Sequence, residues 1–190
     1  MEIAAEGADD VTLVDDAGRP VGRRARATVH DRATPLHLAF SCYLLRHDGQ
    51  LLLTRRALSK PTWPGVWTNS FCGHPRPGED VTDAVGRYAA KELGVAVSHL
   101  TCVLPDFRYR AVDASGVVEN EICPVFVART KDEPVPDPTE VVELRWVTVE
   151  QVRDVVERMP FLVSPWMSLQ MPRLREHLHQ PSAAEEVAAP

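Results

Sequence analysis

Three histidines and two glutamates carry the side chains best suited to hold a metal ion. The histidines are His30, His37 and His74, and the glutamates are Glu119 and Glu121. Residues two apart on an extended strand point to the same face, so the two carboxylates can act together. Three imidazoles with two carboxylates form a mixed site that suits Mn²⁺, Zn²⁺, Fe²⁺ or Mg²⁺. Each of these residues taken alone is more often a surface or capping polar group.

A loop and the helix expected after it carry a second pattern, made of Gly73, Glu79, Arg87, Glu92, Gly94 and Val95. This pattern resembles a degenerate Nudix box, in which helix carboxylates hold Mg²⁺ and the ion bridges diphosphate oxygens. Hydrolytic Nudix enzymes cluster three glutamates late in the box. Here Tyr88 and Lys91 take two of those places, and only Glu92 remains. Such a site can bind a diphosphate but should hydrolyse it poorly.

Five longer stretches flank or overlap this box, at residues 55–60, 63–75, 106–110, 118–124 and 164–167. Together they resemble the type I isopentenyl-diphosphate isomerases, over a span from His30 to Met167. The resemblance implies a Nudix-like α/β (α+β) fold, in which helices flank a mixed β-sheet in a single domain. It also implies an enzyme of isoprenoid biosynthesis that interconverts isopentenyl diphosphate and dimethylallyl diphosphate.

Moving this double bond needs one proton delivered to an alkene carbon and another removed from a carbon two bonds away. The resemblance implies that Cys72 and Glu121 face each other across the substrate, and which one is the acid depends on the direction. A thiol with a pKa of about 8.5 can act as acid or, once ionised, as base. Tyr109 matches a position that hydrogen-bonds the catalytic glutamate. Trp166 offers an indole face that can stabilise a carbocation. Taken alone, Cys72 and Trp166 would be core residues.

The diphosphate of such a substrate needs cationic partners. Arg56 and Lys60 are the expected contacts and Arg26 is a further candidate, although such residues often form a solvated edge. Mg²⁺ that accompanies the diphosphate is expected at Glu92. The resemblance maps one Mn²⁺, Zn²⁺ or Mg²⁺ onto the five His and Glu residues above. No flavin or nicotinamide is expected, because no G-x-G-x-x-G fingerprint follows an expected strand.

The expected elements run in the order strands, helix, strands, helices, which predicts one domain with a mixed sheet. The expected strands lie at residues 11–14, 36–46, 51–55, 103–109, 122–128 and 144–147. Asp48-Gly49 predicts a hairpin between two of them. One helix is expected from Asp80 to residue 93, with Gly94 at its C-terminal cap. Others should start at the capping box of Thr148 and at Ser164, the last running to about His179.

Length and charge limit the classes of function. A chain of 190 residues with 44% hydrophobic residues forms one domain, expected at residues 10–179 between a flexible N-terminus at 1–9 and a disordered tail at 180–190. A net charge of −6 argues against a nucleic-acid partner. The four cysteines form no C-x-x-C pair, and no apolar run reaches the roughly 18 residues of a membrane span. We therefore expect a cytoplasmic monomer that binds a small diphosphate, with no membrane partner.

Two other functions fit part of this pattern. A Nudix hydrolase of a diphosphate substrate would not explain Cys72, the pair Glu119 and Glu121, or the loss of the late glutamates. A non-catalytic, ligand-sensing Nudix-like module would use metal only to fold. This last hypothesis predicts that replacing Cys72 leaves metal binding intact and has no catalytic effect.

Overall fold

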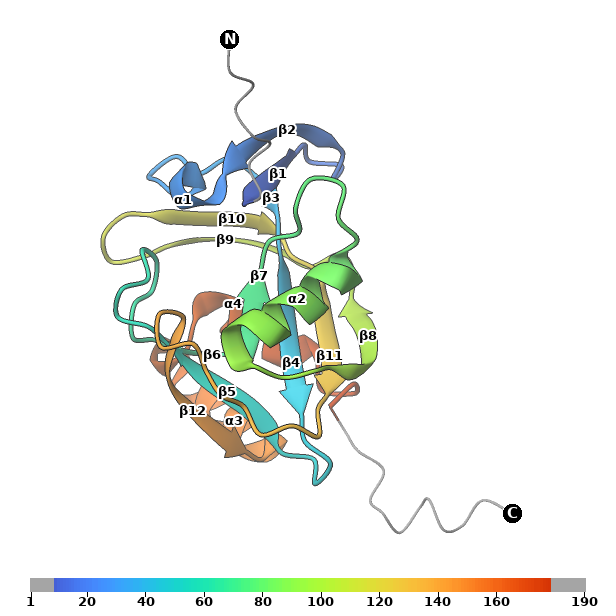
Figure 1. Ribbon diagram of the computed structural model, residues 1–190. Helices are drawn as coiled ribbons and strands as arrows, with labels where there is room; N and C mark the ends of the chain where they lie inside the picture. The colour runs from blue at the N-terminus through green and yellow to red at the C-terminus, as the bar shows by residue number, and fades with distance from the viewer. Residues whose placement is uncertain (1–8, 179–190) are drawn as a thin grey trace.

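Two β-sheets form the centre of the computed structural model, which describes residues 9–178 (Figure 1). The first sheet has the strand order β2-β1-β3-β10-β9. The second has the order β12-β5-β4-β11-β8, with β6 paired to β5 and β7 to β4. The strands are β1 Asp10–Val14, β2 Pro20–Ala25, β3 His37–Leu38, β4 Phe40–Leu45, β5 Leu51–Arg56, β6 Trp67–Thr68, β7 Phe71–Gly73, β8 Ser98–Leu104, β9 Arg108–Val112, β10 Val118–Ile122, β11 Val125–Arg129 and β12 Val141–Val147. The helices are α1 Arg26–Val29, α2 Val81–Leu93, α3 Val149–Arg158 and α4 Pro165–Gln170, with 3-10 turns η1 Pro160–Leu162 and η2 Met171–Arg173.

The chain passes from the first sheet into the second twice, side by side. β3 leads through Ala39 into β4, and β10 leads through residues 123–124 into β11. β3 pairs in parallel with β10, with His37 opposite Glu121, and β4 pairs in parallel with β11. The other strand pairs are antiparallel. Both sheets are therefore mixed, as the sequence predicts.

Side chains alternate along β4 and give the second sheet two apolar faces. Tyr43 and Leu45 belong to the core that includes residues of α3 and α4, whereas Cys42 and Leu44 belong to the core that includes residues of α2. Figure 1 shows α2 in front of β4 and β11, and α4 behind them. Successive strand residues point to opposite faces, so one buried strand can pack against helices on both sides. The predicted single domain with helices flanking a mixed sheet is confirmed.

The first long helix, α2, begins and ends where the sequence predicts. Asp80 caps its start, accepting a hydrogen bond from the backbone N–H of Thr82 at 2.8 Å. Gly94 closes it in the left-handed conformation at φ 65°, which glycine adopts at little steric cost. Ahead of the helix, the Glu79 carboxylate accepts hydrogen bonds from Arg87 at 2.7 and 2.6 Å. This pair fastens the loop after β7 to the helix.

A predicted hairpin and a predicted capping box are also confirmed. β4 and β5 pair through Leu45 and Leu51, and Gly49 in the connecting turn has φ 83°. At the start of α3, the Thr148 side chain accepts from the backbone N–H of Gln151, and the Gln151 side chain accepts from the backbone of Thr148. Each side chain thus satisfies an N–H group that the first turn of a helix leaves without a partner.

Three predicted strands are divided in the structure, those at residues 36–46, 103–109 and 122–128. Pro105 lies between β8 and β9, and Pro124 between β10 and β11. Proline has no N–H to donate to a ladder, so it ends a central strand. The stretch 36–46 divides between β3 and β4 because the chain changes sheets there. These apolar runs are continuous in sequence because both sheets bury them.

The last helix is shorter than predicted. Ser164 caps its start, accepting from the backbone N–H of Met167 at 3.4 Å. The helix ends at Gln170 rather than near His179, and the turn η2 follows. Pro172 explains the early end, because it has no N–H to donate to the carbonyl of Ser168 and so interrupts the α-helical hydrogen bonds. His179 lies outside the described residues, as do most of the ends predicted to be flexible. Within residues 9–178, no helix is long and apolar enough to cross a membrane.

The contact between β7 and α2 gives a test of the packing. A Cβ placed on Gly73 would lie 2.7 Å from three atoms of the Tyr88 ring, which itself packs edge-on against Phe40 at 5.5 Å between centroids. Gly73→Ala should therefore lower the free energy of unfolding by about 2 kcal/mol, because the ring has to shift. Urea unfolding monitored by circular dichroism measures this change.

Gly86→Ala is the matched control. Gly86 lies inside α2, and a Cβ there meets nothing within 4 Å. This substitution should raise the free energy of unfolding by up to about 1 kcal/mol, because alanine loses less backbone entropy in a helix. Equal effects of the two substitutions would contradict the close-packing explanation for Gly73.

Candidate active site

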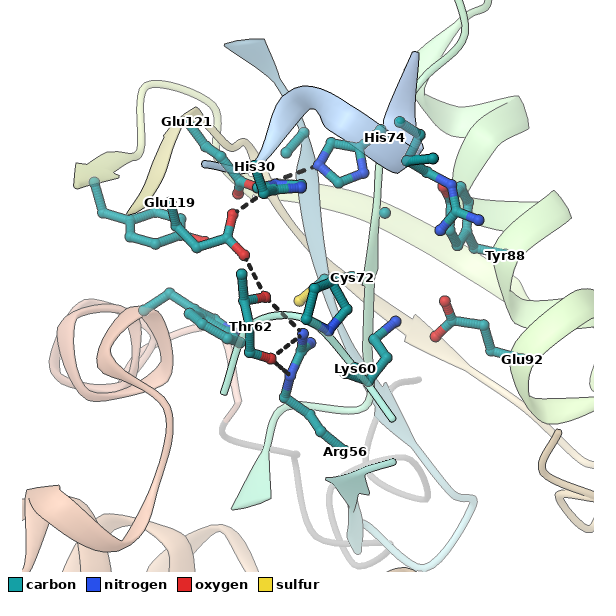
Figure 2. A pocket seen from close by; sticks show the side chains of 17 residues that line it. His30, Arg56, Lys60, Thr62, Cys72, His74, Tyr88, Glu92, Glu119 and Glu121 are labelled. Atoms are coloured by element: carbon teal, nitrogen blue, oxygen red, sulfur yellow. Dashed lines mark hydrogen bonds and ion pairs between the residues drawn. The ribbon is translucent and has the colours of Figure 1, made fainter. Parts of the chain in front are cut away.

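One cavity of about 250 Å³ collects nearly all of the candidate residues (Figure 2). First-sheet strands, the loop after β5, β7, α2 and α4 all contribute to its wall. The candidates that line it are Arg26, His30, Arg56, Lys60, Cys72, His74, Glu92, Tyr109, Glu119, Glu121 and Trp166. The remaining candidate, His37, is fully buried and contacts His74. Residues from both ends of the domain thus meet at one site.

Four of the five predicted metal ligands form a tight cluster. His30, His37, His74 and Glu121 each offer a ligand atom within 4.8 Å of the others. The Nε2 atoms of His37 and His74 are 3.3 Å apart. Oε1 of Glu121 lies 3.3 Å from Nε2 of His74 and 3.4 Å from Nε2 of His37. Nitrogen and oxygen atoms that converge this closely are suited to share one divalent cation.

The backbone around β3 presents His37 to this cluster. Nδ1 of His37 lies 2.9 Å from the carbonyl oxygen of Pro35, and a carbonyl can only accept a hydrogen bond. Nδ1 therefore carries a proton, and Nε2 is the nitrogen that faces His74 and Glu121 and can bind a metal ion once its own proton is lost. A hydrogen bond on the far nitrogen is the usual way in which a ligating imidazole is oriented.

Glu119, the fifth predicted ligand, lies at the edge of the cluster. Its Oε2 atom is 2.9 Å from Nε2 of His30. The two atoms do not have hydrogen-bond geometry, and both are buried without a hydrogen-bond partner. Buried polar atoms are nearly always satisfied. A cation bound by an imidazole nitrogen and a carboxylate oxygen would satisfy both, so the donor set fits a divalent metal ion.

The charges of the cluster also suit metal binding. Burial lowers the pKa of His74 to about 4, despite the hydrogen bond to Glu121. Burial also lowers the pKa of His37, but the hydrogen bond and charge of Glu121 outweigh it, so that pKa is raised. Burial raises the pKa of Glu121, yet hydrogen bonds with His37 and His74 hold it well below its usual range. Glu121 is thus ionised at neutral pH and His74 is neutral, as metal ligands must be.

Cys72 lies on β7 with Ser41 of β4 opposite it. Its Sγ atom is 3.5 Å from Oγ of Ser41 and 3.3 Å from both Nδ2 and Oδ1 of Asn69. Burial raises the pKa of the Cys72 thiol to about 11, although both neighbours favour the ionised form. The thiol is therefore protonated at neutral pH. The cavity holds a protonated thiol and an ionised carboxylate.

The ring of Trp166 forms one wall of the cavity and is 2% exposed. Its indole N–H donates to Oδ1 of Asn69 at 2.9 Å. Trp63 meets the ring edge-on at 5.5 Å between centroids, and Tyr109 lies tilted at 5.8 Å. The guanidinium carbon of Arg56 lies 5.4 Å from the ring centroid. The indole is thus held in one orientation with a cation already near its face.

Tyr109 differs from the prediction in one respect. It stands opposite Glu121 in the pairing of β9 with β10, which brings the two residues to the same face. Within residues 9–178, its hydroxyl makes no hydrogen bond to Glu121, and its ring stacks on Phe107 at 5.9 Å between centroids. Burial, with the charges of Glu121 and Glu119, raises the pKa of Tyr109 well above its ordinary value. The phenol is therefore a protonated neighbour of the carboxylate.

Three cations line the cavity, and Figure 2 shows two of them, Arg56 and Lys60, at the end away from His30 and His74. Arg56 donates from Nε and Nη2 to the carbonyl oxygen of Thr62 at 3.1 and 2.8 Å. The Lys60 ammonium forms an ion pair with Glu140. Arg26, the first residue of α1, lines the same cavity. These positive charges make this end suitable for an anion.

Glu92 of α2 faces the same end of the cavity (Figure 2). Its side chain is buried, and burial raises its pKa to about 7. The charge of Lys60 works against this rise, and the charge of Glu140 adds to it. Burial makes the ionised form of Glu92 unfavourable, and a bound cation would stabilise that form.

Four residues of the site have no counterpart among the predictions. Thr62 and Ser41 contribute hydroxyl groups, Asn69 contributes an amide, and Glu140 contributes a carboxylate that pairs with Lys60. Thr, Ser and Asn are common in loops and strands, so their types alone signal nothing. Glu140 follows a proline-rich loop and reaches Lys60 only through the fold.

Comparisons with known proteins find relatives over most of the chain. Residues 35–168 match the NUDIX domain family. The isopentenyl-diphosphate Delta-isomerase of Paenarthrobacter aurescens strain TC1 is 54% identical over 166 residues, which cover 87% of this chain and 90% of that protein. The protein of the same name from Clavibacter sepedonicus is 53% identical over 181 residues, which cover 95% of each chain.

Solved structures show the same fold at lower identity. DR0079 from Deinococcus radiodurans has a TM-score of 0.66 and 20% identity, and the match covers 87% of this chain and 98% of that one. A MutT NUDIX hydrolase from Burkholderia pseudomallei has a TM-score of 0.56 and 22% identity, over 73% of this chain and 98% of that one. By these matches in sequence and fold, the chain belongs to the isopentenyl-diphosphate Delta-isomerase family of NUDIX domain proteins.

Proposed function

We propose that this chain interconverts isopentenyl diphosphate and dimethylallyl diphosphate by proton transfer through a tertiary carbocation, as a step of isoprenoid biosynthesis. One observation carries the proposal. Cys72 and Glu121, whose pKa values are displaced in opposite directions, line one cavity together with the ring of Trp166. The name shared by relatives at 53–54% identity supports it.

Cys72 and Glu121 are the proposed acid–base pair. An acid and a base that work at the same pH need pKa values moved apart. Here the partly buried thiol holds a proton and the carboxylate does not. One group gives a proton to the substrate and the other removes a different proton from it, which moves the double bond. The first group is then deprotonated and the second protonated, as the reverse reaction requires. Tyr109 is the proposed neutral neighbour that keeps the Glu121 side of the cavity dry.

Trp166 is the proposed stabiliser of the carbocation. Its ring is nearly buried, so a cation formed beside it is not solvated by water. An indole face attracts a cation without forming a bond to it. The hydrogen bond from the indole N–H to Asn69 holds the ring in place before the reaction begins. This preorganisation lowers the cost of stabilising charge in the transition state.

Arg56, Lys60 and Arg26 are the proposed contacts of the diphosphate. All three line the cavity, and Arg56 and Lys60 lie at the end opposite His30 and His74, so a substrate whose diphosphate binds there would place its hydrocarbon part between Cys72 and Glu121. Glu92 is the proposed ligand of Mg²⁺ that accompanies the diphosphate. When bound, that ion adds positive charge where the carboxylate is buried and the phosphates gather.

The five predicted ligands would hold a second divalent cation, Mn²⁺, Zn²⁺ or Mg²⁺. When bound, it supplies a fixed positive charge that keeps the Glu121 carboxylate ionised and in place. We further propose that the enzyme uses no flavin or nicotinamide. A cytoplasmic location and a monomeric state stay predictions, as does the absence of nucleic-acid and membrane partners.

Hydrolysis of a diphosphate is the main competing function. Tyr88 and Lys91 stand where hydrolytic relatives of the box carry glutamates, and the ring of Tyr88 packs between Phe40 and Gly73. Incubation with a nucleoside diphosphate derivative should release no phosphate or nucleotide. A ligand-sensing module without activity would leave the thiol of Cys72 without a chemical role.

The isomerase reaction tests the proposal directly. The purified chain with Mg²⁺ and no reduced flavin should interconvert the two diphosphates. Cys72→Ala and Glu121→Gln should each lower the rate by at least about 10²-fold, because each removes one proton-transfer group. Metal content measured on the same samples separates the two: Cys72→Ala should keep its metal, and Glu121→Gln should lose part of it. A strict need for reduced flavin would overturn the proposal.

Replacement of Trp166 tests the carbocation. A desolvated cation over an indole is stabilised by about 2 kcal/mol or more. If this interaction exists only in the transition state, Trp166→Leu should lower kcat about thirtyfold with little change in KM. Trp166→Phe keeps a weaker aromatic face, so its loss should be clearly smaller. Both variants lose the hydrogen bond to Asn69, so the difference between them reports the aromatic face alone. Equal kcat values, with damage seen only as a lower melting temperature, would make Trp166 a packing residue.

Glu92 makes stability depend on pH. Its pKa rises from 4.5 in the unfolded chain to about 7 in the folded protein. The folded state therefore binds this proton more tightly, and the stability it contributes is complete below pH 4.5 and is lost as pH rises through 7. We expect Glu92→Gln to gain about 3 kcal/mol over the unmodified chain between pH 4.5 and 8, measured by urea unfolding without divalent cations. Parallel curves for the two chains would contradict this assignment.

A further inference from the structure

Thr62 lies between the basic end of the cavity and the histidine cluster. It belongs to the loop between β5 and β6 and is 2% exposed. Figure 2 shows a continuous line of interactions from Arg56 through Thr62 and Glu119 to His30. Among the residues that the structure describes, no other side chain hydrogen-bonds to both the proposed anion site and the proposed metal site.

The direction of the hydrogen bonds along this line follows from the groups themselves. A guanidinium can only donate, so Nη2 of Arg56 donates to Oγ1 of Thr62 at 3.1 Å. An ionised carboxylate can only accept, so Thr62 donates its one hydroxyl proton to Oε1 of Glu119 at 2.8 Å. The Thr62 hydroxyl is therefore held in one orientation by both neighbours. Each bond polarises the other, because Thr62 accepts from a cation and donates to an anion.

At each end of this line of interactions, one atom has no hydrogen-bond partner among the described residues and is free to bind a ligand. Within residues 9–178, Nη1 of Arg56 has no hydrogen bond, since the contacts to Thr62 use Nε and Nη2. Arg56 can therefore bind an anion without releasing Thr62. At the other end, Thr62 occupies Oε1 of Glu119, which leaves Oε2 turned toward His30 and without a hydrogen-bond partner. Glu119 is thus arranged to bind a cation through one oxygen.

We propose that Thr62 is a positioning residue that couples the anion site at Arg56 to the metal site at Glu119. This inference rests on the proposed function for the identity of the two ligands. Hydrogen bonds that orient a ligating carboxylate change metal affinity 10- to 100-fold in known sites. Because coupling free energies are reciprocal, a cation at the cluster and an anion at Arg56 each favour the arrangement that the other needs.

Metal affinity of substituted chains tests the hydroxyl. Zn²⁺ is titrated into the metal-depleted full chain in competition with a chelator of known affinity. Thr62→Val keeps the branched shape without the hydroxyl and should bind Zn²⁺ about tenfold more weakly. Thr62→Ser keeps the hydroxyl and should lie within about threefold of the unmodified chain. Thr130→Val is the matched control: it removes a buried hydroxyl bonded to the carbonyl of Ala96, away from the site, and should not change Zn²⁺ affinity.

A double-mutant cycle with Arg56→Met tests the coupling. Removing this cation also changes the through-space repulsion of Zn²⁺, but that effect is the same with or without the Thr62 hydroxyl and cancels in the cycle. Arg56→Met should weaken Zn²⁺ binding about fivefold more in the unmodified background than in the Thr62→Val background. If Thr62→Val does not fold, Thr62→Ala completes the same cycle.

The outcomes separate the two proposals. Additive effects in the cycle, or Zn²⁺ binding by Thr62→Ser as weak as that of Thr62→Val, would overturn the role of Thr62 even in an active isomerase. Coupled Zn²⁺ binding in a chain without isomerase activity would overturn the proposed function and support the coupling. Neither measurement depends on turnover.

Discussion

The parallel pairing of β3 with β10 determines where the chemistry can take place. It sets His37 opposite Glu121, two residues that are far apart in the chain. The next pair of strands, β10 and β9, sets Tyr109 beside the same carboxylate. Both parallel strands then leave the first sheet at the same level and continue as β4 and β11, and β7 joins β4 there and brings Cys72. A shift of one residue in this register would turn Glu121 to the opposite face.

Burial has opposite effects on the pKa values of different groups around the cavity. It makes the Cys72 thiol hard to ionise and the His74 ring hard to protonate. Glu121 escapes the same effect because two imidazoles bond to it, whereas Glu92 has no imidazole partner among the described residues and its pKa rises to about 7. The pattern of hydrogen bonds, more than the depth of burial, therefore decides which groups carry charge. That pattern leaves a protonated thiol and an ionised carboxylate in one cavity.

Sequence patterns predict the parts of this protein whose signals are local. Caps such as Asp80 and Thr148 bond to residues two or three positions away, so their types and spacing are sufficient. The candidate site residues can be predicted because the stretches of sequence around them resemble a known family. The structure brings them to one cavity, and their individual roles stay proposals. Thr62 cannot be predicted from such a resemblance, because its role depends on its hydrogen bonds with Arg56 of β5 and Glu119 of β10. The division of three strands is missed for the same reason, because it depends on contacts between distant segments. An apolar run indicates that a segment is buried, but it does not indicate which sheet the segment joins.

The position of Arg56 links the charge of the substrate to the ring that is proposed to stabilise its carbocation. Its guanidinium lies 5.4 Å from the centroid of the Trp166 ring and attracts the same electrons that a carbocation would. In the proposed function a diphosphate binds the free Nη1 side of this guanidinium and offsets its positive charge. The repulsion that a second cation near the ring would meet is then reduced, because the anion that offsets it is part of the same substrate. Thr62 holds Arg56 in this place through both its carbonyl and its hydroxyl. The two ends of the cavity are thus electrostatically dependent on each other. An anion bound at Arg56 makes the face of the Trp166 ring more favourable for the proposed carbocation.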